Sequence, residues 1–175
     1  MNDTPRQRAR DVRFLILDVD GVLTDGSLYL GDDGQQYKAF NSRDGHGIRM
    51  LADSGVQIGI LTGRRSQVVE HRCRDLGIQH IVQGRRDKLD ALGGLLEAAG
   101  VGIEHAAYMG DDVVDLPVMR RVVMAIAVAD AHPLVREHAH YITRAGGGRG
   151  AVREACEFIL EAQDNLQAAL APYLE

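Results

Sequence analysis

Two aspartates one residue apart, Asp18 and Asp20, follow the short apolar run Phe14–Leu17. Two carboxylates held this close make each other harder to ionise, so the spacing needs a chemical reason. One such reason is a division of labour, in which one carboxylate attacks as a nucleophile and the other transfers protons. The pair therefore indicates a catalytic site at the end of a buried strand, although a single aspartate there often only caps the next helix.

Three later segments carry polar residues at comparable positions: Thr62 after an apolar run, Lys88 at the start of a helical pattern, and Asp111, Asp112 and Asp115 after another apolar run. Taken singly, these are ordinary turn, surface and helix-cap residues. Together they match phosphoryl transfer through an aspartyl phosphate. Carboxylates suit Mg²⁺, and an ammonium and a hydroxyl can hold the phosphoryl oxygens.

Short apolar runs alternate with helical patterns along the chain, which predicts βαβ units. The expected strands are 14–17, 56–61, 80–82, 106–109, 122–128 and 141–143, and the expected helices are 45–54, 66–76, 88–99, 113–120 and 133–138. Continuous apolar runs indicate strands buried on both faces, as in a parallel sheet. The predicted fold is α/β, a three-layer doubly wound mainly parallel sheet (Rossmann-like), whose strand ends would bring the polar residues to one edge.

The 175 residues are expected to form a single domain. Residues 1–11 are predicted to be a frayed N-terminal tail, and residues 26–41 a small β-hairpin flap around the turn GDDG. Residues 145–175 are predicted to be a glycine-rich tail followed by one C-terminal helix at about 151–170. The intervals between the polar segments leave no room for a cap domain.

Composition argues against several classes of protein. A net charge of −5, no tryptophan and 5% aromatic residues disfavour nucleic-acid binding. No apolar run reaches transmembrane length and no signal peptide is visible, so we expect a cytoplasmic protein without a membrane partner. Residues 43–88 carry nine Lys/Arg against five Asp/Glu, which predicts either exposed helix faces or a local field for a small anion.

The stretches DVDGVLTDG, LTGR, a single lysine and GDDVVD resemble, in order, the four motifs of the haloacid dehalogenase superfamily. The resemblance implies that Asp18 is the nucleophile and Asp20 the general acid/base. It implies that Thr62 and Lys88 bind the phosphoryl group. It also implies that Asp18, the Asp20 carbonyl and Asp111 hold Mg²⁺, with Asp112 and Asp115 as supporting carboxylates. Many members carry a cap domain, so this chain resembles the capless subclass.

Three further stretches, YKAFNSRDGHGI, SQVVEHRCRDLGI and GGGRGAVREACEFIL, resemble the family of 3-deoxy-D-manno-octulosonate 8-phosphate phosphatases, which serve lipopolysaccharide precursor synthesis. The resemblance implies a homotetramer whose hairpins form a central barrel and whose glycine-rich tail reaches toward an adjacent active site. Arginine forks suit the carboxylate of such a sugar acid, although solvated helix faces remain the alternative for Arg49 and Arg72. The implied substrate contacts are Asp20, Asn41, Ser42, Arg43, Asp44, Gly45, Arg49, Arg64, Arg72 and Lys88.

Alternatives stay open at this point. The chain could be a phosphatase of a related keto-sugar acid phosphate, of the sialic-acid type, or an oligomerising module that has lost activity. A phospho-accepting signalling receiver uses similar groups on a similar sheet. Receivers, however, place the acidic pair on the first strand and the phospho-acceptor on a later one, whereas here a proton-transfer group stands two residues from the nucleophile.

Overall fold

The computed structural model describes residues 3–174, whose central feature is a six-stranded sheet in the order β5-β4-β1-β6-β7-β8. Every pairing in this sheet is parallel. The strands are β1 (Phe14–Leu17), β4 (Gln57–Thr62), β5 (His80–Gln83), β6 (Ala106–Gly110), β7 (Met124–Ala127) and β8 (Tyr141–Ile142). The chain crosses outward from β1 in both directions, so the prediction of a doubly wound parallel sheet is confirmed.

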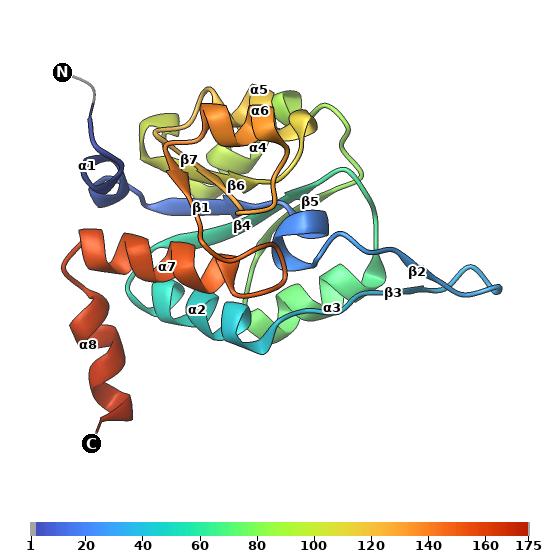
Figure 1. Ribbon diagram of the computed structural model, residues 1–175, viewed down its shortest axis with the longest axis horizontal. Coiled ribbons are helices and arrows are strands. Elements are labelled where there is room, and N and C mark those ends of the chain that lie inside the picture. The colour runs from blue at the N-terminus through green and yellow to red at the C-terminus, as the bar shows by residue number, and fades with distance from the viewer. Residues whose placement is uncertain (1–2, 175) are drawn as a thin grey trace.

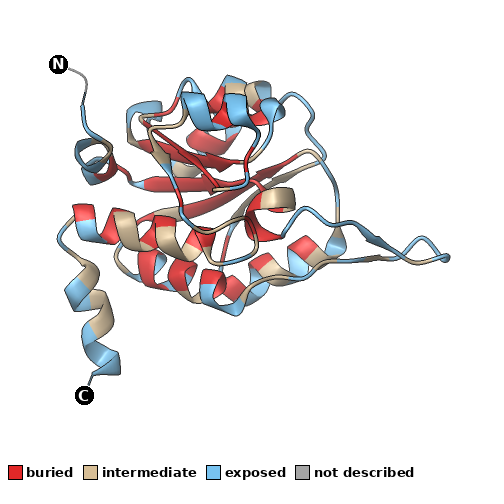
Figure 2. Cartoon of the chain, in the orientation of Figure 1, coloured by how far each residue is buried: buried red, intermediate tan, exposed pale blue. Residues whose placement is uncertain are grey.

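Helices cover both faces of the sheet, giving three layers (Figure 1). One face carries α4 (Lys88–Ala99), α5 (Leu116–Met119) and α6 (Pro133–His138), and the other carries α2 (Ser42–Asp53), α3 (Gln67–Leu76) and α7 (Ala151–Ala162). The two central strands β1 and β6 are buried along their whole length, as Figure 2 shows. Side chains buried on both faces explain why these strands are continuously apolar in the sequence.

A small two-stranded ribbon extends away from the sheet (Figure 1). It pairs β2 (Tyr29–Leu30) with β3 (Gln36–Tyr37) in antiparallel fashion. Its strands are two residues long each, and its apolar side chains are exposed, with Leu30 67% and Tyr37 59% accessible. The ribbon leaves the end of the aspartate segment and returns into α2, so it lies beside the edge of the sheet that carries the site.

The N-terminal segment is helical, and the prediction of a frayed tail over residues 1–11 is wrong for its described part. Helix α1 spans Pro5–Arg10 and begins with a capping box between Thr4 and Gln7, with proline in its first turn. Ala9 is fully buried in the core that α7 helps to form. This local capping, together with burial of one apolar side, orders a segment that looks polar in sequence.

The C-terminal segment also differs from the prediction of one helix over 151–170. Helix α7 ends at Ala162, and a separate helix α8 covers Leu166–Leu170, followed by a 3₁₀ turn at Ala171–Tyr173. Between the helices Asp164 adopts a φ of 58°, a left-handed conformation that aspartate tolerates better than most residues. Nowhere along residues 3–174 is a helix both long enough and apolar enough to cross a membrane.

Candidate active site

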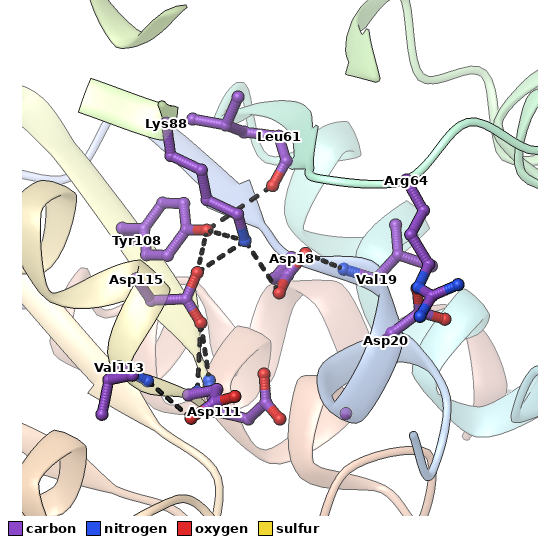
Figure 3. A network of polar contacts seen from close by, with 12 residues as sticks. Asp18, Val19, Asp20, Leu61, Arg64, Lys88, Tyr108, Asp111, Val113 and Asp115 are labelled. Carbon is purple, nitrogen blue, oxygen red and sulfur yellow. Dashed lines mark hydrogen bonds and ion pairs between the residues drawn. The ribbon is translucent and has the colours of Figure 1, made fainter. Parts of the chain in front are cut away.

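Strand β1 delivers the aspartate pair to the carboxyl edge of the sheet (Figure 3). The Asp18 N–H donates to the Met109 carbonyl at 3.1 Å, and an Asp18 carboxylate oxygen accepts the Val19 N–H at 2.7 Å. These two bonds continue the strand by one residue and fix the direction of a side chain that is buried. Asp18 is therefore held in one orientation before any substrate arrives.

A single turn over Val19–Leu23 then reverses the chain, and it depends on Gly21. This residue has φ 86°, in the left-handed region that favours glycine. A Cβ at Gly21 would also lie 2.1 Å from an Asp111 carboxylate oxygen, far inside contact distance. Glycine is thus required both for the turn and for the close approach of Asp111.

The glycine-rich loop before α7 supports this turn from the other side. The Gly148 N–H donates to the Val22 carbonyl at 2.9 Å, and a Cβ at Gly147 would lie 1.8 Å from the Gly21 carbonyl oxygen. The two backbones therefore pack directly against each other. In this structure the loop touches the aspartate turn of its own chain.

Lys88 bridges Asp18 to a buried acidic network (Figure 3). Its ammonium lies 2.8 Å from Asp18 Oδ2, 2.6 Å from Asp115 Oδ1 and 3.1 Å from the Tyr108 hydroxyl. The Tyr108 hydroxyl donates to Asp115 Oδ1 at 2.7 Å. Three acceptors satisfy the three N–H groups of a lysine that is only 3% exposed, as a buried ammonium requires.

Burial and crowding make the carboxylates hard to ionise without a cation. Burial, reinforced by the charge of Asp115, raises the pKa of Asp18 to about 6, although Lys88 opposes the shift. Burial, with the charges of Asp115 and Asp18, raises the pKa of Asp111 to about 7. Burial alone would lower the pKa of Lys88, but Asp18 and Asp115 outweigh it and hold the ammonium charged. The site thus carries excess negative potential that a divalent cation would offset.

Among residues 3–174, carboxylate oxygens of Asp18, Asp111 and Asp115 lie within 4.8 Å of one another and could hold a metal ion. Asp115 is already engaged: its Oδ1 accepts from Lys88 and Tyr108, and its Oδ2 accepts the N–H of Asp111 at 3.0 Å. Asp115 is also fully buried, whereas Asp18 and Asp111 line the open cavity at this edge of the sheet, so Asp18 and Asp111 are the side chains that could bind a cation. A donor set of hard carboxylate oxygens fits Mg²⁺, and Asp115 supports it by fixing Asp111 and Lys88.

Asp20 lies at the rim, between two cations. Arg64 Nε is 3.9 Å from Asp20 Oδ2, and Lys38 pairs with Asp20 Oδ1. An open cavity of about 400 Å³ faces these groups. Of the residues predicted from sequence, the ones that line it are Asp18, Asp20, Thr62, Arg64, Lys88, Asp111 and Asp112. These residues come from four separate segments of the chain, as parallel strands ending at one edge require.

The remaining predicted substrate contacts lie along α2 and α3, outside this cavity. Asn41 caps α2 by accepting the Arg43 N–H at 2.8 Å and donates to the Gly148 carbonyl at 3.3 Å. Arg72 lies over the Phe40 ring and donates to the Asn41 carbonyl. A Cβ at Gly45 would lie 2.2 Å from the Arg72 guanidinium, so this glycine makes room for the arginine.

Asp44 has a structural partner in this chain. Its carboxylate is buried and accepts the N–H groups of Arg153, at 2.8 Å, and Gly150, at 3.4 Å. It therefore caps the start of α7, whose own N-cap residue is a glycine without a capping side chain. Arg49 bonds the Asp75 carbonyl of α3, and Ser42 and Arg43 are exposed. Contact of these side chains with substrate stays a prediction.

Two residues of the site escaped the sequence analysis, namely Tyr108 and Lys38. Tyr108 lies within an apolar strand, so the sequence predicts an ordinary core residue. Its role becomes visible only in the structure, where its buried hydroxyl bonds Lys88 and Asp115. Lys38 is the single basic residue in the segment 26–41, and this isolated charge could have marked it as a candidate site residue. A lysine on a short ribbon nevertheless looks solvated, and its pairing with Asp20 depends on the path of the hairpin.

Comparison with known proteins agrees with this geometry. The profile of haloacid dehalogenase-like hydrolases matches residues 74–152. The 3-deoxy-D-manno-octulosonate 8-phosphate phosphatase KdsC of Escherichia coli K12 is 52% identical over 162 residues, covering 93% of this chain and 86% of that protein.

Solved structures of phosphatases are also similar to this chain. A probable YrbI family phosphatase from Pseudomonas syringae has a TM-score of 0.95 and 54% identity, covering 98% of this chain and 97% of that one. The phosphatase of Moraxella catarrhalis, solved with magnesium, phosphate and a KDO molecule, has a TM-score of 0.94 and 43% identity, covering 97% of each chain.

Proposed function

This chain belongs to the 3-deoxy-D-manno-octulosonate 8-phosphate phosphatases of the haloacid dehalogenase-like hydrolases, and we propose on this premise that it releases phosphate from that sugar acid through an aspartyl phosphate on Asp18. The reaction supplies the free sugar acid for lipopolysaccharide precursors. The observation that carries the proposal is the buried Asp18–Lys88 pair at 2.8 Å, with Asp20 two residues on and facing the same cavity.

In the first half-reaction, an Asp18 carboxylate oxygen attacks phosphorus and the bond from phosphorus to the sugar oxygen breaks. The Asp20 carboxylic acid gives its proton to that leaving oxygen, which departs as an alcohol. Lys88 stays beside Asp18 and, with the Thr62 hydroxyl, stabilises the phosphoryl oxygens as charge redistributes. Only a group held in position can act in this way, and Tyr108 and Asp115 hold Lys88.

In the second half-reaction, water attacks the phosphorus of the aspartyl phosphate. Asp20, now a carboxylate, accepts a proton from that water, and the bond from phosphorus to the Asp18 oxygen breaks to release phosphate. Asp18 returns as a carboxylate and Asp20 as an acid, so both groups are restored. The spacing of Asp18 and Asp20 makes both carboxylates harder to ionise, but it also lets one turn of the chain supply the groups that act in both half-reactions.

Magnesium is the cofactor, in keeping with the acidic donor set of this chain and with the magnesium in the Moraxella catarrhalis complex. Asp18, Asp111 and the Asp20 carbonyl would hold it. The bound ion supplies positive charge that offsets repulsion between the Asp18 carboxylate and the phosphate.

The substrate carboxylate and hydroxyls would meet the basic surface formed by α2 and α3. Arg64 lies at the cavity, and Arg72 and Asn41 lie where the hairpin returns into α2. Planar guanidinium groups suit a carboxylate partner. We assign these residues, with Ser42, Arg43, Gly45 and Arg49, to recognition of the sugar acid.

We propose further that the enzyme is a homotetramer of the cytoplasm. The exposed apolar side chains of the β2–β3 ribbon support association between copies, because an apolar patch on a protruding element marks an interaction surface. Two buried cysteines without a disulfide, Cys73 and Cys156, suit a reducing compartment. Light scattering would give the assembly mass, and a monomer would exclude the tetramer.

The test of function is a phosphate-release panel with and without a chelator. The octulosonate 8-phosphate should be hydrolysed with the highest kcat/KM, and the chelator should abolish release. Faster turnover of a nine-carbon, sialic-acid-type phosphate would reassign the substrate within the class. A phosphoenzyme that persists without turnover would favour the signalling receiver.

A further inference from the structure

Lys38 is a buried cation that the catalytic scheme above does not use. It stands where β3 returns toward α2, and its side chain is only 3% exposed. Its ammonium forms an ion pair with Asp20 Oδ1. Burying an ammonium is unfavourable unless a partner compensates for the lost hydration. The Asp20 carboxylate is that partner for Lys38.

Asp20 has few other restraints. Within residues 3–174, the bond from Lys38 is the one hydrogen bond that its side chain makes. Arg64, at 3.9 Å from the other carboxylate oxygen, is beyond hydrogen-bond distance, and its side chain is 55% exposed. Lys38 therefore sets the direction of the Asp20 carboxyl group.

We propose that Lys38 is a positioning residue, which holds Asp20 so that Oδ2 faces the leaving oxygen during proton transfer. The proposal rests on the proposed function, because it assumes a strongly basic sugar alkoxide that must be protonated as it leaves. Proton transfer requires heavy atoms within about 2.6–3.2 Å, a range that a freely rotating carboxyl group samples rarely. Lys38 donates to Oδ1 and leaves Oδ2 for the proton.

The pairing also links the hairpin to the chemistry. Lys38 follows Tyr37, the last residue of β3, so any restraint on the ribbon reaches Asp20 through a single side chain. Phe40 and Asn41, which complete the connection into α2, are held by Arg72. The segment 38–41 is thus anchored at both ends.

The test compares Lys38→Met with the wild type on two substrates. One is the sugar phosphate, whose leaving group needs a proton, and the other is p-nitrophenyl phosphate, whose leaving group does not. First-turnover rates, taken by rapid mixing with magnesium, isolate the step in which Asp18 is phosphorylated. We expect the rate on the sugar phosphate to fall by about tenfold to a hundredfold, which is part of the roughly 10²- to 10⁴-fold that general acid catalysis contributes, and the rate on the aryl phosphate to fall by less than about threefold.

Controls separate positioning from other roles. Lys38→Arg, which keeps a donor, should recover part of the rate on the sugar phosphate. In the Asp20→Asn background, Lys38→Met should add little further loss, because coupled residues give non-additive effects. Circular dichroism establishes that each variant is folded, and Lys38→Leu, which also lacks a donor, replaces Lys38→Met if the latter is not.

Two results would overturn the proposal. Equal losses on both substrates would make Lys38 a general structural support, and a rise in KM with unchanged kcat would make it a substrate anchor. If the wild type itself fails on the sugar phosphate, the proposed function fails. The Lys38 comparison is then made with the best alkyl phosphate that the wild type hydrolyses, and the same two results decide it.

Discussion

The ionisation of Asp18 should make the metal-free protein less stable as the pH rises. Burial and Asp115 raise the pKa of this carboxyl from 3.8 to about 6. Below the lower value the folded and unfolded states are both protonated. Between the two values the unfolded state loses its proton first, so each step up in pH favours unfolding until the folded carboxyl has ionised as well.

The shift sets the size of the effect. About two pKa units correspond to about 3 kcal/mol, and roughly half of this develops between pH 5 and pH 8. The Asp18→Asn variant has no carboxyl to ionise at this position, so it should lack this part of the decrease in stability with rising pH. The difference in unfolding free energy between the two proteins should therefore change by about 1–2 kcal/mol across this pH range.

The assay is urea unfolding in a chelator, followed by circular dichroism at equal protein concentrations. The wild type should lose stability relative to Asp18→Asn as the pH rises from 5 to 8. Parallel pH dependences for the two proteins, or a wild type that gains on the variant toward pH 8, would refute the reasoning. The test is how the difference in unfolding free energy between the two proteins changes with pH. The absolute difference is not the test, because Asp18→Asn also changes the partner of Lys88 at every pH.

Magnesium should reverse the effect where the carboxylates are ionised. An ion that binds only the folded state at a hundred times its Kd adds about 2.7 kcal/mol. The gain should be larger at pH 8 than at pH 5, because a protonated carboxyl binds a cation poorly. It should be small at both pH values in Asp18→Asn.

Three further predictions follow from the contacts around the site. Asp18→Asn should abolish phosphate release, measured by a phosphate assay, while its circular dichroism spectrum stays that of the wild type. Gly147→Ala should lower kcat/KM by roughly tenfold or more, because its Cβ would displace the Gly21 carbonyl in the turn over Val19–Leu23. The matched control Gly93→Ala, whose Cβ meets nothing within 4 Å, should be neutral in the same assay. Asp44→Ala should destabilise the protein by about 1–2 kcal/mol in urea unfolding, because α7 loses its cap, and an unchanged stability would mean that the cap contributes nothing.

The sheet could be predicted because its signal is local. Each central strand is a continuous apolar run, and burial on both faces produces that run directly. The order of polar residues at the strand ends then follows from parallel topology. For this reason the sequence predicts that Asp18, Thr62, Lys88 and Asp111 lie at one edge of the sheet, and the structure brings them to one cavity.

The residues that escaped prediction act through distant partners. Tyr108 has an ordinary strand sequence around it, and its role depends on Lys88 and Asp115, which lie 20 and 7 residues away. Asp44 is expected from the resemblance as a substrate contact, but its role as the cap of a helix 106 residues further along the chain is not visible in the sequence. Helix α1 could have been predicted from its Thr4–Gln7 capping box, but its stability depends on packing that no local sequence pattern reveals.

The central claim is covalent attachment of phosphate to Asp18, and peptide mass spectrometry of Asp20→Asn tests it most directly. The variant is mixed with magnesium and p-nitrophenyl phosphate, whose leaving group needs no proton from Asp20, and is then quenched in acid within the first turnover and digested. Without the Asp20 carboxylate to activate water, the peptide carrying Asp18 should gain the mass of one phosphoryl group, and Asp18→Asn/Asp20→Asn should not. Substrate consumed with no phosphoryl group on that peptide, or with the group on another residue, would contradict the account.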